Sequence, residues 1–356
     1  EFRFEYFRDP DVAGEGFKGD QFDWWDENRA KRWATGYDFP AVQQKRVVQE
    51  LYPQPNADEG RMVGFVFNLR NPKFQDVRVR EAFNDAFDFE TLNKTVFYGQ
   101  YQRINSFFFG TPLASSGLPT GRELDILNSV KDKIPPEVFT TPYTNPVAGD
   151  PTKERANLKS ALDLLTAAGY HLDGNKLVDA NGQQLSVEIL MDGPTLDPVT
   201  NPYTQALNRL GIAVNVRDVD DAEYTNRVRS RDFEITYTDW IQSLSPGNEQ
   251  KYMFGSASAK DNSSDNYAGL ADPGVDALID KVIFAKGRDE LTAAVHALDR
   301  VLLALHIVVP SYTNEKERIA HWDRFSHADK LPLYSIGFPD IWWYDEAKAE
   351  KTGKAQ

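Results

Sequence analysis

Apolar residues recur along the chain with two different periods, and these periods predict strands and helices. Apolar residues alternate over 63–67, which is typical of a strand with one buried face. After Asp76, which can cap a helix, they follow at helical spacing over 79–87. A second short helix is expected over 88–97, and Gly99 can supply the left-handed residue that ends it. The stretch therefore predicts a strand followed by two helices.

The same two periods continue through the middle of the chain. They predict helices and strands in turn at 158–168 (helix), 185–189 (strand), 198–210 (helix), 212–216 (strand), from Asp220 (helix) and 233–237 (strand). Two further amphipathic helices are expected at 272–283 and 291–305, and an apolar run follows at 307–310. Strands that alternate with helices predict an α/β lobe whose helices cover its sheet.

Two regions have different patterns. Phe2, Phe4 and Tyr6 alternate, which predicts a strand already under way, so we expect a further segment to precede it. The stretch 107–150 is rich in Pro, Gly, Ser and Thr and predicts long surface loops with one short helix near 122–130. Disorder is the alternative for 140–152.

Length and composition narrow the class of protein. A chain of 356 residues is too long for one ordinary core, so two lobes are expected. The net charge of −14 argues against nucleic acid and anionic membranes as partners. The chain has no cysteine, which excludes disulfides, thiolate metal sites and cysteine nucleophiles. No apolar run approaches the roughly 20 residues that a membrane span needs.

Two stretches resemble a known family. Residues 74–88, with the pattern F-x-D-x-R-V-R-x-A-F-N-x-A-x-D, resemble the segment by which extracellular solute-binding proteins of family 5 enter their second lobe. These proteins are the peptide, nickel and opine receptors of ABC importers. Residues 26–41 resemble a first-lobe signature of the oligopeptide and microcin-type subgroup. By this resemblance Asn28 and Trp33 would face the cleft and are candidates for ligand binding.

The resemblance implies a fold and a set of partners. It implies a two-lobed α/β fold of the type II periplasmic-binding-protein kind, with an incomplete first lobe. Residues 1–67 and 312–356 would belong to that lobe and 68–311 to the second, with hinge crossings near 68 and 311. It also implies a monomeric periplasmic receptor of a Gram-negative bacterium. This receptor would capture a short peptide or peptide conjugate, an oligopeptide, microcin C-like compound or muropeptide, between its lobes and deliver it unchanged to an ABC permease, without a cofactor.

The stretch 240–250 is the main candidate for ligand binding. It follows the predicted strand at 233–237, so it leaves the edge of the sheet where open α/β folds bind ligands. Tryptophan supplies rigid apolar contact, and neutral polar side chains supply hydrogen bonds. The candidate residues here are Trp240, Gln242, Ser243, Leu244, Ser245 and Asn248. Phe108, in the triplet 107–109, is a further candidate, although packing is the preferred interpretation of the triplet. A capped turn around Pro246 and Gly247 is the alternative for the stretch.

The stretch departs from the family at Ser243. Peptide receptors of this family often have Asp three residues after the Trp, and its carboxylate takes the free α-amine of the ligand. A serine hydroxyl cannot neutralise an ammonium group. We therefore expect a ligand that is recognised without a free amine at this position. Asp239 is expected to point away from the face that Trp240 uses.

Catalytic interpretations find less support. The five histidines lack the spacing of metal-ligand pairs, and no nucleophile elbow, phosphate-binding loop or dinucleotide fingerprint is present. No enzyme activity and no metal are therefore expected. An acidic, aromatic-rich glycoside hydrolase with two carboxylates is the enzyme alternative. A peptide-binding or chaperone-like module without a transport role is the third possibility.

Overall fold

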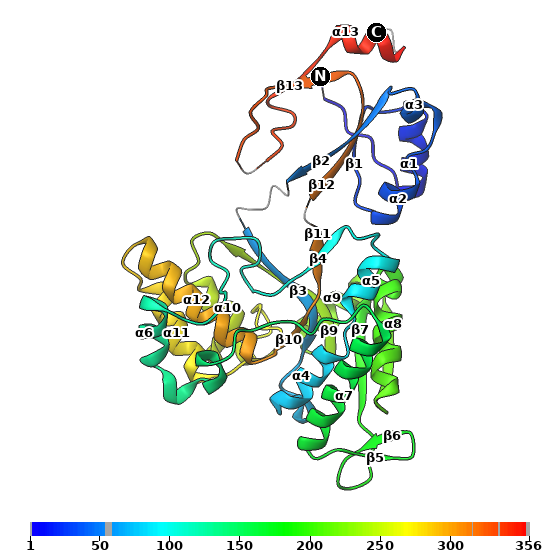
Figure 1. Ribbon diagram of the computed structural model, residues 1–356. Coiled ribbons are helices and arrows are strands. Elements are labelled where there is room, and N and C mark those ends of the chain that lie inside the picture. Colours follow the sequence, from blue (N-terminus) through cyan, green and yellow to red (C-terminus); the bar gives the residue numbers. More distant parts are fainter. Residues whose placement is uncertain (1, 54–58, 315, 334, 354–356) are drawn as a thin grey trace. The chain divides into compact units, whose positions relative to one another are not determined.

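The computed structural model describes residues 2–53, 59–314, 316–333 and 335–353. The chain divides into two compact units (Figure 1). The first unit comprises 1–57, 93–102 and 314–356, and the second comprises 58–92 and 103–313. The predicted lobe boundaries near 68 and 311 stay a prediction.

The first unit is built on a three-stranded antiparallel sheet with the order β1-β12-β2. Its strands are β1 (Trp24–Asp26), β2 (Val47–Pro53), β12 (Lys316–Trp322), β13 (Phe325–His327) and β14 (Trp342–Tyr344). Its helices are α1 (Pro10–Lys18), α2 (Ala30–Thr35), α3 (Pro40–Gln43) and α13 (Glu346–Thr352). The short strands β4 (Tyr101–Arg103) and β11 (Tyr312–Asn314) pair with each other where the chain passes from one unit to the other.

The second unit is built on a five-stranded mixed sheet with the order β10-β3-β9-β7-β8. Its strands are β3 (Glu59–Phe67), β7 (Ser186–Asp192), β8 (Ala213–Val219), β9 (Ile235–Ser243) and β10 (Val308–Pro310), with a separate hairpin of β5 (His171–Asp173) and β6 (Lys176–Val178). Strands β7, β8 and β9 are parallel, whereas β3 is antiparallel to β9 and β10. The first residues of β3 therefore lie at the same edge as the last residues of β9.

Helices cover the sheet of the second unit. They are α4 (Val77–Asp85), α5 (Phe89–Thr95), α6 (Gly121–Asn128), α7 (Pro151–Ala167), α8 (Asp197–Arg209), α9 (Asp221–Ser230), α10 (Glu249–Phe254), α11 (Pro273–Ile283) and α12 (Arg288–Ala304). Short 3-10 turns lie at η2 (Pro72–Phe74), η3 (Lys131–Lys133), η4 (Pro136–Phe139), η5 (Pro194–Leu196) and η6 (Ser256–Lys260). Phe65 packs against Phe87 and Tyr203 on one face of the sheet. The large core formed with α6, α11 and α12 lies on the other face and contains Met62 and Trp240.

Most of the predicted elements are confirmed. Asp76 caps α4, since its carboxylate accepts a hydrogen bond from the N–H of Arg78 at 2.9 Å. The helices predicted near 158–168, 198–210, 272–283 and 291–305 are α7, α8, α11 and α12. The stretch 140–149 has a described course without a regular element, and α7 begins after it.

The strand predicted at the start of the chain is wrong. Phe2, Phe4 and Tyr6 have no strand conformation, and their side chains are exposed by 63%, 80% and 92%. An alternating pattern becomes a strand only when a neighbouring strand supplies hydrogen bonds, and no described strand pairs with this segment.

Candidate functional site

The Trp240 segment lies in the antiparallel ribbon formed by β3 and β9. The two strands pair without a break as far as Glu59 and Ser243. The sequence predicted that the strand ends near Tyr237 and that a ligand loop begins at Trp240. That boundary is wrong, because Trp240 to Ser243 are strand residues and the turn begins after them.

The end of this ribbon has two different faces. Along β9 from 239 to 243 and along β3 from 59 to 63, buried positions alternate with half-buried or exposed positions. The inward face carries Gly60, Met62, Trp240 and Gln242. The outward face carries Glu59, Arg61, Val63, Asp239, Ile241 and Ser243. Asp239 points away from Trp240, as predicted. The face that carries Trp240 is buried, and the face that carries Asp239 and Ser243 is the accessible one.

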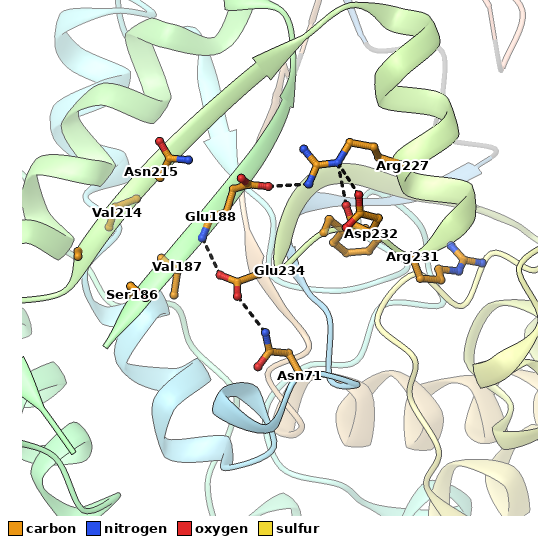
Figure 2. A pocket seen from close by; sticks show the side chains of 12 residues that line it. Asn71, Ser186, Val187, Glu188, Val214, Asn215, Arg227, Arg231, Asp232 and Glu234 are labelled. Atoms are coloured by element: carbon orange, nitrogen blue, oxygen red, sulfur yellow. Dashed lines mark hydrogen bonds and ion pairs between the residues drawn. The ribbon is translucent and has the colours of Figure 1, made fainter. Parts of the chain in front are cut away.

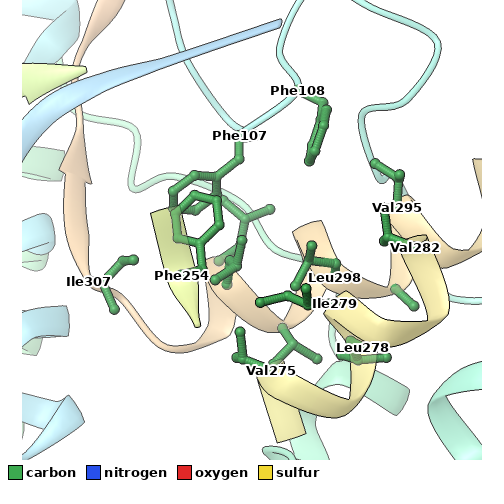
Figure 3. Packing of buried hydrophobic residues seen from close by; sticks show 14 of the residues in the cluster. Phe107, Phe108, Phe254, Val275, Leu278, Ile279, Val282, Val295, Leu298 and Ile307 are labelled. Atoms are coloured by element: carbon green, nitrogen blue, oxygen red, sulfur yellow. The ribbon is translucent and has the colours of Figure 1, made fainter. Parts of the chain in front are cut away.

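Trp240 is a core residue with only 2% of its surface exposed. Its ring centroid lies 5.6 Å from that of Phe107, 5.5 Å from that of Phe254 and 5.8 Å from that of Tyr267. The indole N–H donates a hydrogen bond to the carbonyl oxygen of Asp265 at 2.9 Å. Figure 3 shows Phe107 and Phe254 in this core. The Trp240 side chain therefore anchors the ribbon to the second unit, and a role in ligand contact stays a prediction.

Gln242 is also buried, and its polar atoms are satisfied inside the unit. The amide nitrogen of Gln250 donates a hydrogen bond to the Gln242 side-chain oxygen at 2.6 Å. The Gln242 amide nitrogen donates to the sulfur atom of Met253 at 3.5 Å. A buried amide needs such partners. Gln242 therefore fixes α10 beneath the ribbon.

The remaining candidates of this stretch lie at the last residue of β9 and in the turn after it. Ser243, Ser245 and Asn248 are exposed, and Leu244 is half-buried. The backbone N–H of Ser245 donates to the Ser243 hydroxyl oxygen at 3.2 Å. The guanidinium of Arg288, in the first turn of α12, donates to the carbonyl oxygen of Leu244. The turn is thus accessible and is tied to α12.

The loop that contains the Phe triplet is held by one buried carboxylate. Asp299 of α12 accepts hydrogen bonds from the hydroxyl of Ser106 at 2.8 Å, the N–H of Phe107 at 2.7 Å, and the N–H and hydroxyl of Ser115 at 2.9 and 2.7 Å. Burial raises the pKa of Asp299, whereas these hydrogen bonds oppose that shift. Replacement of Asp299 would leave several buried donors without an acceptor.

The next residue of α12 holds the following part of the loop. The buried Arg300 guanidinium donates to the carboxylate of Glu123 at 2.8 Å and to the carbonyl oxygens of Gly117 at 2.7 Å and Ser116 at 3.2 Å. Asp299 and Arg300 therefore bind donors and acceptors of the same loop from adjacent positions on one helix.

Phe108 belongs to the core and approaches β3 closely. Its side chain has no exposed surface, and it belongs to the same cluster as Val295 of α12, which Figure 3 also labels. A Cβ atom at position 60 would lie 2.6 Å from the Phe108 Cα, so only glycine at this position permits the approach. The preferred interpretation of Phe108 as a packing residue agrees with this burial. A ligand contact by Phe108 stays a prediction.

The two first-unit candidates differ in exposure. Asn28 is exposed, whereas Trp33 is half-buried and its ring centroid lies 5.5 Å from that of Tyr37. Beside them, the buried carboxylate of Glu27 accepts hydrogen bonds from the Trp25 indole at 3.0 Å and the Tyr37 hydroxyl at 3.1 Å. Burial and the Glu27 charge raise the pKa of Tyr37. Ligand contact by Asn28 or Trp33 stays a prediction.

A separate hollow of about 660 Å³ lies at the opposite edge of the second sheet, near the first residues of β7 and β8. Figure 2 shows that Arg227 pairs with Glu188 and Asp232 in this hollow, and that Glu234 is hydrogen-bonded to Asn71. Arg227 contacts Glu188 at 2.7 Å and Asp232 at 3.1 Å, and Glu234 accepts a hydrogen bond from Asn71 at 3.0 Å. Open α/β folds bind ligands at the other edge. We therefore interpret this hollow as a structural ion network.

Two further properties follow from the described part of the chain. Among the described residues, no three His, Asp or Glu side chains lie close enough together to hold a metal ion. In the same residues, each helix is too short or too polar to cross a lipid bilayer.

Comparison with known sequences identifies relatives along nearly the whole chain. The model of a family described as bacterial extracellular solute-binding proteins, family 5 (middle), matches residues 1–262. The uncharacterized protein y4wM of Sinorhizobium fredii is 52% identical over 97% of this chain and 52% of its own length. The probable peptide-binding protein YejA of Agrobacterium fabrum is 51% identical over 97% of this chain and 56% of its own. The peptidoglycan-binding protein YepA of the same organism is 34% identical over 96% and 57%. The chain thus spans a little more than half the length of these relatives.

Solved structures show the same fold at low sequence identity. The oligopeptide-binding protein AppA of Bacillus subtilis, in complex with a nonapeptide, matches with a TM-score of 0.68 and 14% identity over 94% of this chain and 58% of that one. The murein tripeptide binding protein MppA of Escherichia coli matches with a TM-score of 0.59 and 14% identity over 93% and 54%. These likenesses confirm the predicted periplasmic-binding-protein fold.

Proposed function

Because the chain belongs to the bacterial extracellular solute-binding proteins of family 5, we propose that it is the substrate-binding component of an ABC importer. In this proposal it captures a short peptide or peptide conjugate and delivers it unchanged to a permease in the membrane. The observation that carries the proposal is the family match over residues 1–262. The proposed compartment is the periplasm of a Gram-negative bacterium, and the proposed state is a monomer.

Named relatives support a peptide-type ligand. One relative that is 51% identical is named a probable peptide-binding protein, and another that is 34% identical is named a peptidoglycan-binding protein. A peptide and a peptide-bearing cell-wall fragment have amide groups and charged ends in common. Oligopeptides, muropeptides and microcin C-like conjugates are therefore the ligand classes that we propose to test.

The ribbon of β3 and β9 supports binding at its outward face. Trp240 and Gln242 fix the ribbon from within, and Asp299 fixes the neighbouring loop. The accessible side chains of this rigid support are mostly polar or charged, with Ile241 as an exposed apolar residue among them. They lie at the edge of the sheet where open α/β folds bind ligands. A site on rigid elements loses little conformational entropy when a ligand binds.

Native mass spectrometry of the chain, purified without unfolding, tests the proposal. We expect a co-purified peptide or muropeptide mass that disappears after the protein has been denatured and refolded. The matched measurement is turnover of a chromogenic glycoside by the same preparation, because a glycoside hydrolase is the enzyme alternative. A glycan adduct together with turnover would contradict the receptor function.

A further inference from the structure

The outward face of the ribbon carries a row of charges with alternating sign. Glu59 and Arg61 are neighbours on this face of β3, and Asp239 lies on β9 beyond Arg61. Ser243 lies directly opposite Glu59 in the register. Side chains that face each other in this way have Cβ atoms about 5 Å apart. Glu59 and Ser243 can therefore contact one ligand group together.

The Arg61 side chain forms its ion pair with Asp239 and not with Glu59. Its Nε atom lies 3.3 Å from a carboxylate oxygen of Asp239, and the two side chains are 43% and 40% exposed. An ion pair this exposed contributes little to stability. The ion pair nevertheless directs the Arg61 guanidinium toward Asp239. Within the part of the chain that the structure describes, no cation lies within ion-pair distance of Glu59.

We propose that Glu59 and Ser243 bind a primary ammonium group of the ligand and that Asp239 is a positioning residue that keeps Arg61 from neutralising Glu59. This inference rests on the proposed function as a peptide receptor. The carboxylate takes the positive charge, and the serine hydroxyl accepts one of the three N–H hydrogen bonds of the ammonium.

The proposal changes the ligand expected from the sequence. Ser243 alone predicts recognition without a free amine, because a hydroxyl carries no charge. The register of the ribbon places a carboxylate across from that hydroxyl, on the neighbouring strand. The ammonium can come from the α-amine of a peptide or from a lysine-like side chain, and the test distinguishes these two sources.

The support beneath this pair is rigid. Gly60, next to Glu59, packs against the backbone of Phe108, and the N–H of Arg61 donates to the carbonyl oxygen of Phe109 at 3.4 Å. The N–H of Ser245 donates to the Ser243 hydroxyl oxygen at 3.2 Å, which orients that oxygen. The backbone beside Glu59 and the hydroxyl of Ser243 are thus held in place before a ligand arrives.

Isothermal titration calorimetry with three synthetic peptides tests the proposal. The probes are tetra-alanine, N-acetyl-tetra-alanine and N-acetyl-Ala-Lys-Ala-Ala. We expect the wild-type chain to bind tetra-alanine at least tenfold more tightly than its acetylated form. Tight binding of the acetylated lysine peptide instead would identify the side-chain ammonium as the source. Either preference supports an ammonium site.

Four variants assign the preference to named residues. Glu59→Gln should abolish it, and Asp239→Asn should weaken it severalfold by releasing Arg61 toward Glu59. The double variant of Asp239→Asn and Arg61→Gln should restore it, which a purely structural role of Asp239 would not produce. Asp280→Asn is the matched control, because Asp280 forms an exposed ion pair with Lys251 at 3.2 Å elsewhere in the second unit.

The outcomes separate this inference from the proposed function. If the wild-type chain binds peptides without any preference for an ammonium, or if Glu59→Gln keeps the preference, the inference is wrong and the peptide receptor stands. If none of the three peptides binds, the inference is wrong. If native mass spectrometry also shows no co-purified peptide or muropeptide, the proposed peptide-binding function is wrong as well. Circular dichroism of each variant establishes that it is folded.

Discussion

The two units of this protein are stabilised by different kinds of side chains. The largest core of the second unit is the one in which the aliphatic faces of α11 and α12 meet the sheet, and a smaller cluster contains Leu190, Val219, Val228 and Phe233. The first unit has two small clusters rich in aromatic rings, and it contains six of the seven tryptophans. It also carries 19 acidic and 16 basic residues, whereas the second unit carries 35 and 24. The acidic excess of the chain therefore belongs mostly to the second unit.

This difference means that the two units should respond to different perturbations. Aliphatic burial contributes stability in proportion to the apolar area removed from water. The first unit has less of that area, so stacked rings and ion pairs contribute a larger share. Tryptophan fluorescence reports mainly the first unit, and far-UV circular dichroism reports mainly the helices of the second. The two signals can therefore be followed separately during unfolding.

The largest effect is expected for Leu298→Ala in the core of the second unit. Leu298 is fully buried, so its truncation leaves a cavity and should lower the free energy of unfolding by about 3 kcal/mol. Urea unfolding should show an earlier circular dichroism transition with little change in the fluorescence transition. Leu172→Ala, on the exposed hairpin, is the control. Equal shifts of both signals would show that the units unfold as one.

A pH effect on the second unit is expected from His306. Burial lowers the pKa of His306 to about 4, with the Arg80 charge adding to the shift. The unfolded chain therefore binds a proton that the folded one does not, and stability falls as the pH decreases from about 6.5 to 4, by at most about 3 kcal/mol. Urea midpoints from circular dichroism at pH 7, 5.5 and 4.5 measure it.

The variant His306→Asn is the control for this pH effect, and Glu50 of the first unit provides the comparison. His306 has a φ of 46°, which asparagine tolerates, so His306→Asn should remove the pH dependence. In the first unit, the hydrogen bond from His321 lowers the pKa of Glu50. That contribution to stability is present above the unfolded pKa of Glu50 and is lost only as the pH falls through the lower folded value. A fluorescence transition that weakens already at pH 5.5 would contradict this order.

A smaller effect is expected for Arg324→Met in the first unit. The Arg324 side chain is fully buried and contacts Asp20 at 2.6 Å and Asp23 at 2.5 Å. Because both carboxylates are partly exposed, the loss should be about 2 kcal/mol, below the value for a fully buried pair. The fluorescence transition should move and the circular dichroism transition should not. Arg3→Met, at an exposed pair with Glu5, is the control, and an equal shift there would refute the assignment.

The sequence predicted those helices and strands that are determined by residues close together in the chain. The apolar periodicity and the Asp76 cap depend on residues close together in the chain, so the helices and most strands of the second unit could be predicted. The end of β9 could not. Gln242 faces inward and Ile241 faces outward, which reverses the usual pattern, and Gln250 of another element satisfies the buried amide.

The candidate site was predicted only in part for the same reason. The stretch 240–250 begins at the predicted edge of the sheet, but which of its faces is accessible depends on the core behind it. Glu59 and Arg61 lie about 180 residues before Ser243 and meet it only through the register of β3 and β9. Alternation along 59–62 was the available signal, since Gly60 and Met62 are the apolar positions of that stretch.

Helix α12 connects two segments that are far apart in the sequence, the turn after β9 and the loop at 106–117. Arg288 binds the turn after β9, while Asp299 and Arg300 bind the loop at 106–117. An attempt to graft the loop of a related receptor onto this scaffold would therefore fail unless the matching residues of α12 were transferred with it. Evolution of new specificity along this lineage is expected to alter the helix and both loops together.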